Sequence, residues 1–508
     1  MLIISTIMVA RVHTVAPVGF EGSMVEVESD AKSGLPAIQI VGMGTKSVDE
    51  AKERVRSAIG NSLLEFPAKK ITINLAPAEL VKDGAHFDLP IALALLISSG
   101  QVRQNEVNDA VFAGELGLDG SLRPIRGAIN IAEAAKKAGV STLYVPKTNA
   151  DQACLIDGIA VIGIASLKEL YLHLKGEARL SPTADSEDRS KASGASAPLI
   201  DDVHGQEQAK RALTIAVAGR HNMLLSGPPG AGKTMLAKTL LGLMPTLTPD
   251  ERIAVTKLHS IAGEVDGEIV ASRPFRAPHH TTSPVAVIGG GTKPKPGEIS
   301  LAHLGVLFMD EMPEYPRSVL EALRQPLEDK KIAVTRAGGR VVYPADFMLV
   351  ATMNPCPCGY LGDPTKECSC STTQIIGYQK RLSGPLLDRI DLIVGVSRVP
   401  NETLLEQKAK QNEQHLTALE FIERARKAQE LRYESSMIYN GSLTSSQVHK
   451  LFSLQEDAKQ LLNAAGERLG LSARSYFKII KVAQTIADMD GDATIQKMHI
   501  AEALQYRG

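Results

Sequence analysis

The chain has 508 residues, with 56 Lys and Arg against 57 Asp and Glu, which gives a net charge of −1. This length predicts two or three domains, and the balanced charge excludes nucleic-acid binding through a global positive field, so any such contact needs a local basic patch. No apolar run reaches the roughly 18 residues of a membrane helix, and we expect a cytoplasmic protein with no membrane partner.

Four segments follow one another along the chain. The apolar start, residues 1–10, lacks a basic region and predicts a buried first strand in place of a signal peptide. Residues 1–175 alternate strand-like and helix-like patterns, with a strand over 70–75 and a helix over 127–139. Residues 176–197 carry no periodicity and predict a flexible linker. Residues 198–396 predict an α/β core with a parallel sheet, and 397–508 predict a helical region.

The strongest motif fits the phosphate-binding pattern G-x-x-x-x-G-K-[ST]. It follows an apolar strand over 222–226 and opens a helix over 235–243, which is the context that the motif requires. Its residues are Gly227, Pro228, Pro229, Gly230, Ala231, Gly232, Lys233 and Thr234. Glycines let several backbone N–H groups point at one phosphate, and the helix N-terminus adds partial positive charge. We expect Lys233 to reach the β- and γ-phosphates of ATP and Thr234 to ligate Mg²⁺.

Two further strands end in polar residues that suit the same chemistry. The strand over 305–309 is followed by Asp310, placed to face the metal ion, and by Glu311, placed to polarise the attacking water. An ordinary Asp-Glu turn is the alternative, which the neighbouring phosphate loop disfavours. The strand over 347–353 is followed by Asn354, whose amide could hold that water. Arg389 and Arg474 lie in short helical contexts, and spacing alone gives them no role beyond a surface salt bridge.

Four of the five cysteines form two C-x-C pairs, Cys356 with Cys358 and Cys368 with Cys370. Glycine and proline between the pairs suit a loop that folds back. Four thiolates can close a structural tetrahedral Zn²⁺ site and leave no open position for catalysis. An unmetallated or redox-labile loop is the alternative. Cys154 stands alone and is most simply a core thiol.

The chain resembles the magnesium-chelatase-like AAA+ proteins of the ComM/YifB group over nearly its whole length. The segments that carry the resemblance are 25–27, 34–36, 40–42, 73–77, 88–90, 227–234, 273–280, 307–311, 354–359 and 387–389. The resemblance implies a P-loop AAA+ core with a C-terminal helical lid, in which Asn354 is sensor 1 and Arg474 is sensor 2. It also implies that Arg389 is an arginine finger offered to a neighbouring subunit, and therefore a homo-oligomeric, hexameric ring.

The same resemblance implies a DNA branch-migration helicase that supports homologous recombination and natural transformation, with single-stranded or branched DNA and recombination proteins as partners. Residues 330–343 predict a β-hairpin with a turn at Gly338-Gly339. In MCM-like relatives such a hairpin projects into the ring channel, so Lys331, Arg336 and Arg340 are candidates for phosphate contact. Arg273, Arg276, His279 and His280 form a second candidate loop, before the strand over 305–309. Solvated charges or subunit-interface contacts are the alternatives for both.

Residues 1–175 resemble the proteolytic, Lon-protease-like α+β domain. The segment 82–90 matches the Lon pattern around the nucleophilic serine, and 114–127 matches the segment before the catalytic lysine. Those two positions are His86 and Ile129 here, so the Ser–Lys dyad is absent and the peptidase is lost. We expect the domain to mediate contacts with other subunits, DNA or a partner protein.

Two functions remain in competition. One is a ring ATPase that moves on DNA, and the other is a protein-remodelling AAA+ ATPase related to the magnesium chelatase ATPase subunit. The front domain argues against a true chelatase subunit, which we expect to resemble the AAA+ part alone.

Overall fold

The computed structural model describes residues 9–184, 198–291, 294–336, 339–363, 366–399 and 412–507. It divides the chain into two compact units. The first comprises Met1–Ala192 with Leu247–Ala271, and the second comprises Ser193–Thr246 with Ser272–Gly508. Among the described residues, no helix is both long enough and apolar enough to span a bilayer.

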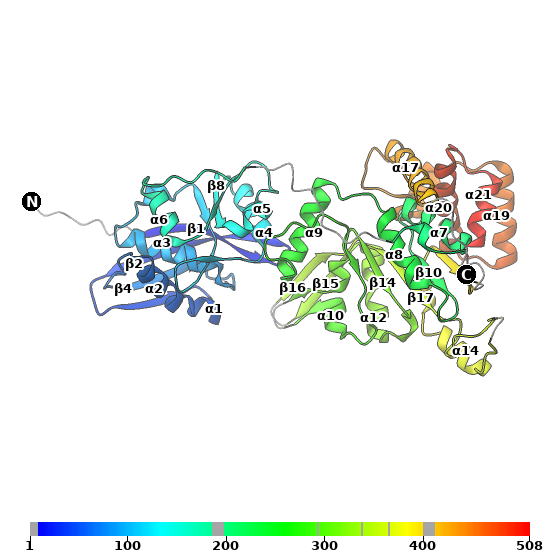
Figure 1. The fold of residues 1–508 in the computed structure, drawn as a ribbon, viewed down its shortest axis with the longest axis horizontal. Helices are drawn as coiled ribbons and strands as arrows, with labels where there is room; N and C mark the ends of the chain where they lie inside the picture. Colours follow the sequence, from blue (N-terminus) through cyan, green and yellow to red (C-terminus); the bar gives the residue numbers. More distant parts are fainter. Residues whose placement is uncertain are drawn as a thin grey trace, which may run out of the picture. The chain divides into compact units, whose positions relative to one another are not determined.

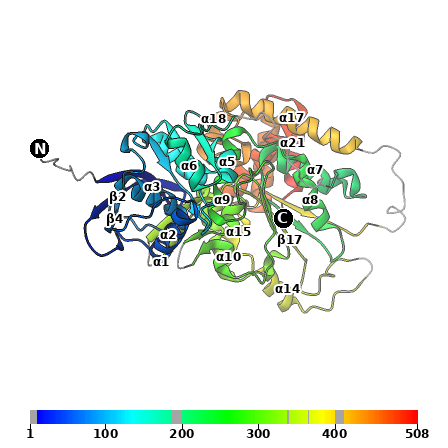
Figure 2. The same cartoon turned by 60° about the vertical axis from the view of Figure 1, so that its left-hand side comes forward.

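The first unit is built on a mixed seven-stranded sheet, of order β3-β4-β2-β1-β5-β8-β9 (Figure 2). Its strands are β1 (Ala10–Val18), β2 (Glu21–Lys32), β3 (Ala37–Val41), β4 (Lys70–Ala76), β5 (Ala110–Phe112), β8 (Thr142–Pro146) and β9 (Ala160–Ile164). The main helices are α2 (Ala51–Asn61), α3 (Asp88–Ser98), α4 (Ala128–Lys137) and α6 (Leu167–Leu174). The strand expected over 70–75 and the helix expected over 127–139 are both confirmed.

Alternation along β1 places apolar side chains on both faces of this sheet. Val12 belongs to the apolar cluster that contains the side chains of α3, whereas Val15 belongs to the cluster that contains those of α4. Since successive strand residues point to opposite faces, the two helices cover opposite sides of the sheet. The result is a three-layer unit in which α3 is buried from Asp88 to Leu96.

The first unit also takes in α9 (Pro249–Ala262), which departs from the expected core boundaries of 198–396. This helix packs on α4, where the Lys257 ammonium lies 2.5 Å from a Glu133 carboxylate oxygen. The backbone N–H of Gly127 donates to the Ser260 hydroxyl at 3.0 Å. Residues 247–271, between the phosphate-loop helix and the next core strand, therefore form an insertion that belongs to the first unit.

The described part of the second unit holds a five-stranded parallel sheet, of order β11-β14-β17-β10-β18 (Figure 1). The strands are β10 (Met223–Ser226), β11 (Phe275–Arg276), β14 (Val306–Met309), β17 (Met348–Met353) and β18 (Leu392–Gly395). Residues on β10, β14 and β17 are almost all buried, which explains their continuous apolar runs. Helices α7 (Glu207–Gly219) and α8 (Lys233–Leu243) pack beside the sheet. The expected parallel α/β core is confirmed.

The C-terminal region is helical, as expected, over its described residues 412–507. Its helices are α17 (Glu413–Tyr433), α18 (Ser445–Leu451), α19 (Glu456–Leu469), α20 (Ala473–Asp490) and α21 (Lys497–Gln505) (Figure 1). One apolar cluster joins α17, α20 and α21 to α7 and to the sheet, so these helices and the core form a single compact unit.

The predicted hairpin is also present, as β15 (Lys331–Arg336) paired with β16 (Gly339–Pro344) in antiparallel register. The predicted turn includes Gly338, which lies outside the described residues, as do residues 1–8 of the expected first strand and residues 185–197 of the expected linker.

Candidate functional site

The phosphate-binding loop joins β10 to α8 at the carboxyl edge of the parallel sheet, where such folds bind their ligands. Gly230 and Gly232 have φ angles of 78° and 85°, a conformation that glycine adopts without cost. A Cβ on Gly227 would lie 2.0 Å from the Val396 carbonyl oxygen, so only glycine fits there. The sequence therefore fixes a loop whose backbone approaches its neighbours closely.

Lys233, at the first turn of α8, folds back over this loop. Its ammonium donates to the carbonyl oxygens of Gly227 at 2.5 Å and Pro228 at 3.0 Å, and to the amide oxygen of Asn354 at 3.1 Å. The pKa of Lys233 is lowered, because burial disfavours the charged ammonium more than the nearby carboxylates of Asp310 and Glu311 favour it. The structure thus brings together the lysine and the amide that the sequence placed on separate strands.

Asp310 and Glu311 follow β14, the neighbour of β17. The Thr234 hydroxyl donates to one Asp310 oxygen at 3.3 Å, so the two predicted Mg²⁺ ligands lie side by side. Thr352, on β17, donates its hydroxyl to the other Asp310 oxygen at 2.6 Å and accepts the N–H of Glu311 at 2.9 Å. Glu311 itself has a φ of 50°, which turns the chain sharply after the strand.

Thr352 was not among the predicted site residues. It is fully buried, and its hydroxyl fixes both acidic residues at once. A single polar side chain inside the otherwise apolar strand Met348–Met353 is the signal that could have identified it.

Arg389 and Arg474 come together on one carboxylate, that of Glu328 at the end of α13 (Arg324–Asp329). One Arg389 nitrogen contacts Glu328 directly, and an Arg474 nitrogen lies 3.4 Å from its second oxygen. Arg389 also donates to the Pro385 carbonyl oxygen at 2.5 Å. The hydrogen bond from Arg389 lowers the pKa of Glu328. Glu328 had no sequence signal, because its partners lie 61 and 146 residues away.

The four cysteines of the C-x-C pairs form one cluster. The sulfur of Cys356 lies 3.4 Å from that of Cys358 and 3.6 Å from that of Cys368, and all four sulfurs lie within 4.8 Å of one another. All four are free thiols. Zinc–sulfur bonds of about 2.3 Å in a tetrahedron place sulfurs about 3.8 Å apart, so this set, completed by Cys370, fits a structural Zn²⁺ ion.

The cysteine loop, which follows Asn354 and carries the four cysteines, contacts the phosphate-binding loop. A Cβ on Gly359, whose φ is 86°, would lie 2.6 Å from Cδ of Pro229. Because the loop begins directly after Asn354, its shape constrains both the amide and the glycine-rich loop. The fifth cysteine, Cys154, lies half-buried in the first unit, where it packs against an apolar cluster.

The candidate DNA-contacting residues separate into two groups. Lys331 and Arg340 are exposed on the hairpin, and neither forms an ion pair with a described residue; the side chain of Arg336 lies outside the described part. In contrast, Arg273 donates to the carbonyl oxygens of Pro245 at 2.6 Å and Leu304 at 2.7 Å. Arg276 makes a bidentate ion pair with Glu298, at 2.6 and 2.8 Å.

Both arginines of that second group are thus engaged within the chain. DNA contact through Arg273 and Arg276 stays an untested prediction, and their geometry favours a role in holding β11 and its flanking loops. The free cations of the hairpin suit phosphate contact better.

The two residues at the Lon-type positions are both in the core of the first unit. The His86 ring nitrogen Nε2 lies 3.1 Å from the Val15 carbonyl oxygen, and burial lowers the pKa of His86 to about 4. Ile129 is completely buried on α4. Neither side chain offers a nucleophile or a general base to a peptide.

Three family models match the chain. "Magnesium chelatase, subunit ChlI" matches residues 199–404, "Subunit ChlI of Mg-chelatase" matches 27–149, and "Magnesium chelatase, subunit ChlI C-terminal" matches 413–507. The match over 27–149 carries the chelatase subunit's name, so the presence of a front domain does not by itself separate this chain from chelatase subunits.

Several curated proteins are similar over nearly the full length. The chain is 42% identical over 502 residues to competence protein ComM of Haemophilus influenzae, covering 98% of this chain and 97% of that protein. It is 42% identical over 501 residues to the uncharacterized protein YifB of Escherichia coli, with 98% and 96% covered. The magnesium-chelatase 67 kDa subunit of Chlorobaculum parvum is 27% identical over 157 residues, covering 30% of this chain and 23% of that protein.

Proposed function

Since this chain belongs to the magnesium-chelatase-like ATPase family that includes ComM and YifB, we propose that it is a ring-forming, ATP-driven motor that moves branched DNA during recombination. The observation that carries the proposal is the convergence of Lys233, Asn354, Asp310 and Thr234 at one edge of the parallel sheet. Family membership and this geometry support an ATPase. The DNA-directed activity is the proposed part.

ATP hydrolysis assigns one task to each of these side chains. The N–H groups of the loop and the ammonium of Lys233 bind the β- and γ-phosphates, for which Lys233 exchanges the carbonyl contacts it now makes. Thr234 and Asp310 would hold Mg²⁺, which would supply positive charge to neutralise the phosphates. Glu311 accepts a proton from the attacking water, and Asn354 orients that water.

Arg389 completes the site from a neighbouring copy of the chain, and Arg474 adds a second guanidinium as sensor 2. A guanidinium on the γ-phosphate stabilises the charge that develops in the transition state, which can accelerate hydrolysis by about 10³- to 10⁵-fold. Their shared position on Glu328 supports action on one common phosphate. A homo-oligomeric ring, hexameric by family resemblance, is then required for turnover.

The four clustered cysteines would hold a structural Zn²⁺ ion. The ion would fix the shape of the loop between Asn354 and α14 (Thr372–Gln379), which is otherwise too short of apolar residues to form a core. Cys356, Cys358, Cys368 and Cys370 would be its ligands, and none of them takes part in hydrolysis.

Two observations support DNA as the substrate: the exposed cations of the hairpin and the names of the similar proteins. Lys331 and Arg340 present charge on β15 and β16 that no described residue pairs, and such cations bind phosphates without reading sequence. The near full-length likeness to a protein named for competence supports DNA as the substrate. The first unit keeps a Lon-like fold without peptidase chemistry in this proposal, and it contacts other subunits, DNA or a recombination protein.

A protein-remodelling ATPase, favoured by the chelatase names of the family models, is the second candidate. A branch-migration assay on a synthetic four-way junction, with purified protein and with or without ATP, separates the two. ATP-dependent conversion of the junction supports the DNA motor. ATPase activity that rises with a protein partner and ignores DNA would favour remodelling.

A further inference from the structure

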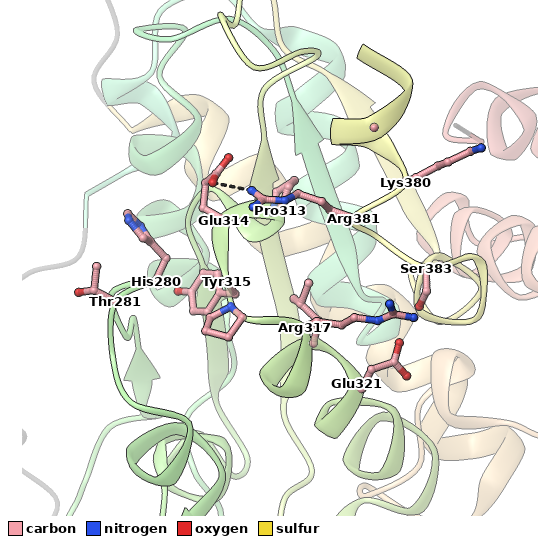
Figure 3. Close-up of a pocket in the computed structure, with 13 residues that line it drawn as sticks. His280, Thr281, Pro313, Glu314, Tyr315, Arg317, Glu321, Lys380, Arg381 and Ser383 are labelled. Carbon is pink, nitrogen blue, oxygen red and sulfur yellow. Dashed lines mark hydrogen bonds and ion pairs between the residues drawn. The ribbon is translucent and has the colours of Figure 1, made fainter. Parts of the chain in front are cut away.

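A polar cavity of about 590 Å³ lies in the second unit, and His280 of the second candidate DNA loop is the one lining residue to which the sequence had given a role. Its walls come from residues 280–281, from 313–321 directly after Glu311, and from 377–383 between the cysteine loop and Arg389 (Figure 3). This volume falls within the roughly 300–1,000 Å³ of ligand-binding sites. No ATP-site residue, cysteine or hairpin residue lines it, so the proposed function leaves it without a role.

The side chains that line this cavity carry more positive than negative charge. Of its two carboxylates, Glu314 pairs with Arg381 at 2.6 Å, and Glu321 pairs with Arg324 at 2.6 Å. Arg317 and Lys380 are exposed, and neither has a hydrogen bond or ion pair from its side chain to a described residue. Two full positive charges therefore remain available to an anionic ligand.

The cationic and aromatic groups stand on opposite sides of the cavity. Arg317, Lys380 and Ser383 lie on one side, and His280 lies on the other beside Tyr315 (Figure 3). The Tyr315 hydroxyl donates to the Pro278 carbonyl oxygen, which fixes the segment that carries His280. The His280 ring is only half-buried; it stands edge-on to the Tyr315 ring, with centroids 6.4 Å apart, and is tilted against the His279 ring, with centroids 4.1 Å apart. A flat ligand can therefore meet a ring on one side and cations on the other.

This combination fits a single strand of nucleic acid. Proteins that bind single strands without sequence preference place cations along the phosphates and rings against the bases. A duplex hides its bases from such a ring, and an acidic peptide has no base to stack. The segments that line the cavity are also connected to residues of the ATP site. Glu314 follows Glu311 by three residues, and Gln379 donates its amide to the Pro355 carbonyl oxygen at 3.2 Å, one residue after Asn354.

We propose that this cavity binds a phosphate and an adjoining base of single-stranded nucleic acid and reports that occupancy to Glu311 and Asn354. The proposal rests on the proposed DNA-directed function and names a surface for it. A strand bound between Arg317 and Lys380 would shift the Glu314–Arg381 ion pair. That ion pair joins the segment after Glu311 to the segment before Arg389, so its displacement would reach both.

The test uses the full-length protein and fluorescein-labelled oligothymidylate, with anisotropy measured over a salt series. The variant is Arg317→Ala with Lys380→Ala, and the matched control is Arg468→Ala with Lys497→Ala, two exposed cations of the helical region that also lack a partner among the described residues. Loss of two phosphate contacts should weaken binding about tenfold. It should also reduce the slope of log K against log[salt] by about 1.4, at about 0.7 for each phosphate. The control should match the wild type.

ATPase rates with increasing oligonucleotide form the second readout, each normalised to the DNA-free rate of the same variant. The oligonucleotide concentration for half-stimulation should rise by the same factor as the dissociation constant. Arg317→Lys, which keeps the charge, should restore most of the salt slope. Inorganic phosphate added at constant ionic strength is the probe for a free anion.

Each outcome decides the proposal. If the wild type binds DNA and the double variant matches the control in oligonucleotide affinity and ATPase stimulation, the cavity is not a strand-binding site. The proposed function is unaffected by that result. If the wild type neither binds nor responds to DNA, the proposed function fails together with the strand-binding site. If the double variant loses phosphate binding but keeps oligonucleotide binding, the cavity takes a free anion and the strand assignment is refuted.

Discussion

Replacing Thr352 by valine tests whether the acidic pair after β14 is held from the neighbouring strand. The change keeps the volume of a fully buried side chain and removes one hydroxyl. That hydroxyl donates to the Asp310 carboxylate at 2.6 Å and accepts the Glu311 N–H at 2.9 Å. A hydrogen bond to a charged group contributes about 1.5–3 kcal/mol, and a buried N–H left without a partner costs about 1–3 kcal/mol.

We therefore expect Thr352→Val to lower the free energy of unfolding by about 2–3 kcal/mol. If a similar amount of positional energy is lost at Asp310 and Glu311, kcat for ATP hydrolysis falls about 30- to 150-fold. The assay is steady-state ATPase activity at a temperature where circular dichroism shows the variant fully folded. KM should change less than kcat, because the phosphate loop and Lys233 are untouched.

Thr256→Val is the matched control. Thr256 is also fully buried, and its hydroxyl accepts the Val270 N–H at 3.1 Å within the first unit. This variant should lose about 1 kcal/mol of stability and keep its kcat. A folded Thr352→Val protein with the kcat of the wild type would refute the positioning role that we assign to this hydroxyl.

Four further substitutions follow from the same geometry. Lys233→Ala should abolish measurable ATP binding in equilibrium titration, since its ammonium is the cation of the phosphate loop; tight binding would remove that assignment. Glu311→Gln should bind ATP and turn it over at least about 100-fold more slowly, and full turnover would exclude Glu311 as the base. Cys356→Ser should lower the zinc content measured by mass spectrometry and reduce the melting temperature. A wild-type protein that contains no zinc, together with a variant that melts at the wild-type temperature, would exclude a zinc site. His86→Gln should flatten the loss of stability in acid, because the neutral His86, with a pKa of about 4 when folded and about 6.5 when unfolded, contributes stability above pH 6.5 that is lost as the pH falls toward 4. That loss amounts to about 3 kcal/mol in urea titrations; it is read as the difference between wild type and variant, since the raised pKa of Asp88, about 6, acts in the opposite direction.

The parts of the site that could be predicted are those that lie on consecutive residues. The phosphate loop and the carboxylates after β14 are short patterns whose chemistry depends on local backbone, and the structure places Lys233, Asp310 and Asn354 together as expected. The four cysteines were predictable for the same reason, because two short pairs on one loop need little of the rest of the fold.

The residues that were missed depend on contacts between distant segments. Glu328 meets Arg389 and Arg474 only because α13, the turn before β18 and the start of α20 converge. The position of α9 was missed for a related reason. Its apolar pattern predicts a helix but does not tell which sheet it will cover, and here the Lys257–Glu133 pair and the Ser260 hydroxyl hold it in the first unit.

Mixing two inactive variants tests the central claim most directly. Glu311→Gln keeps Arg389, and Arg389→Ala keeps Glu311, so a site formed between one protomer of each kind has both groups. At equal amounts, about a quarter of the interfaces in a closed ring combine an intact base with an intact finger, and we predict that ATPase activity returns to roughly that fraction of the wild-type rate. Mixtures as inactive as either variant alone, or an Arg389→Ala protein that hydrolyses ATP at full speed, would contradict a site completed by a neighbouring subunit.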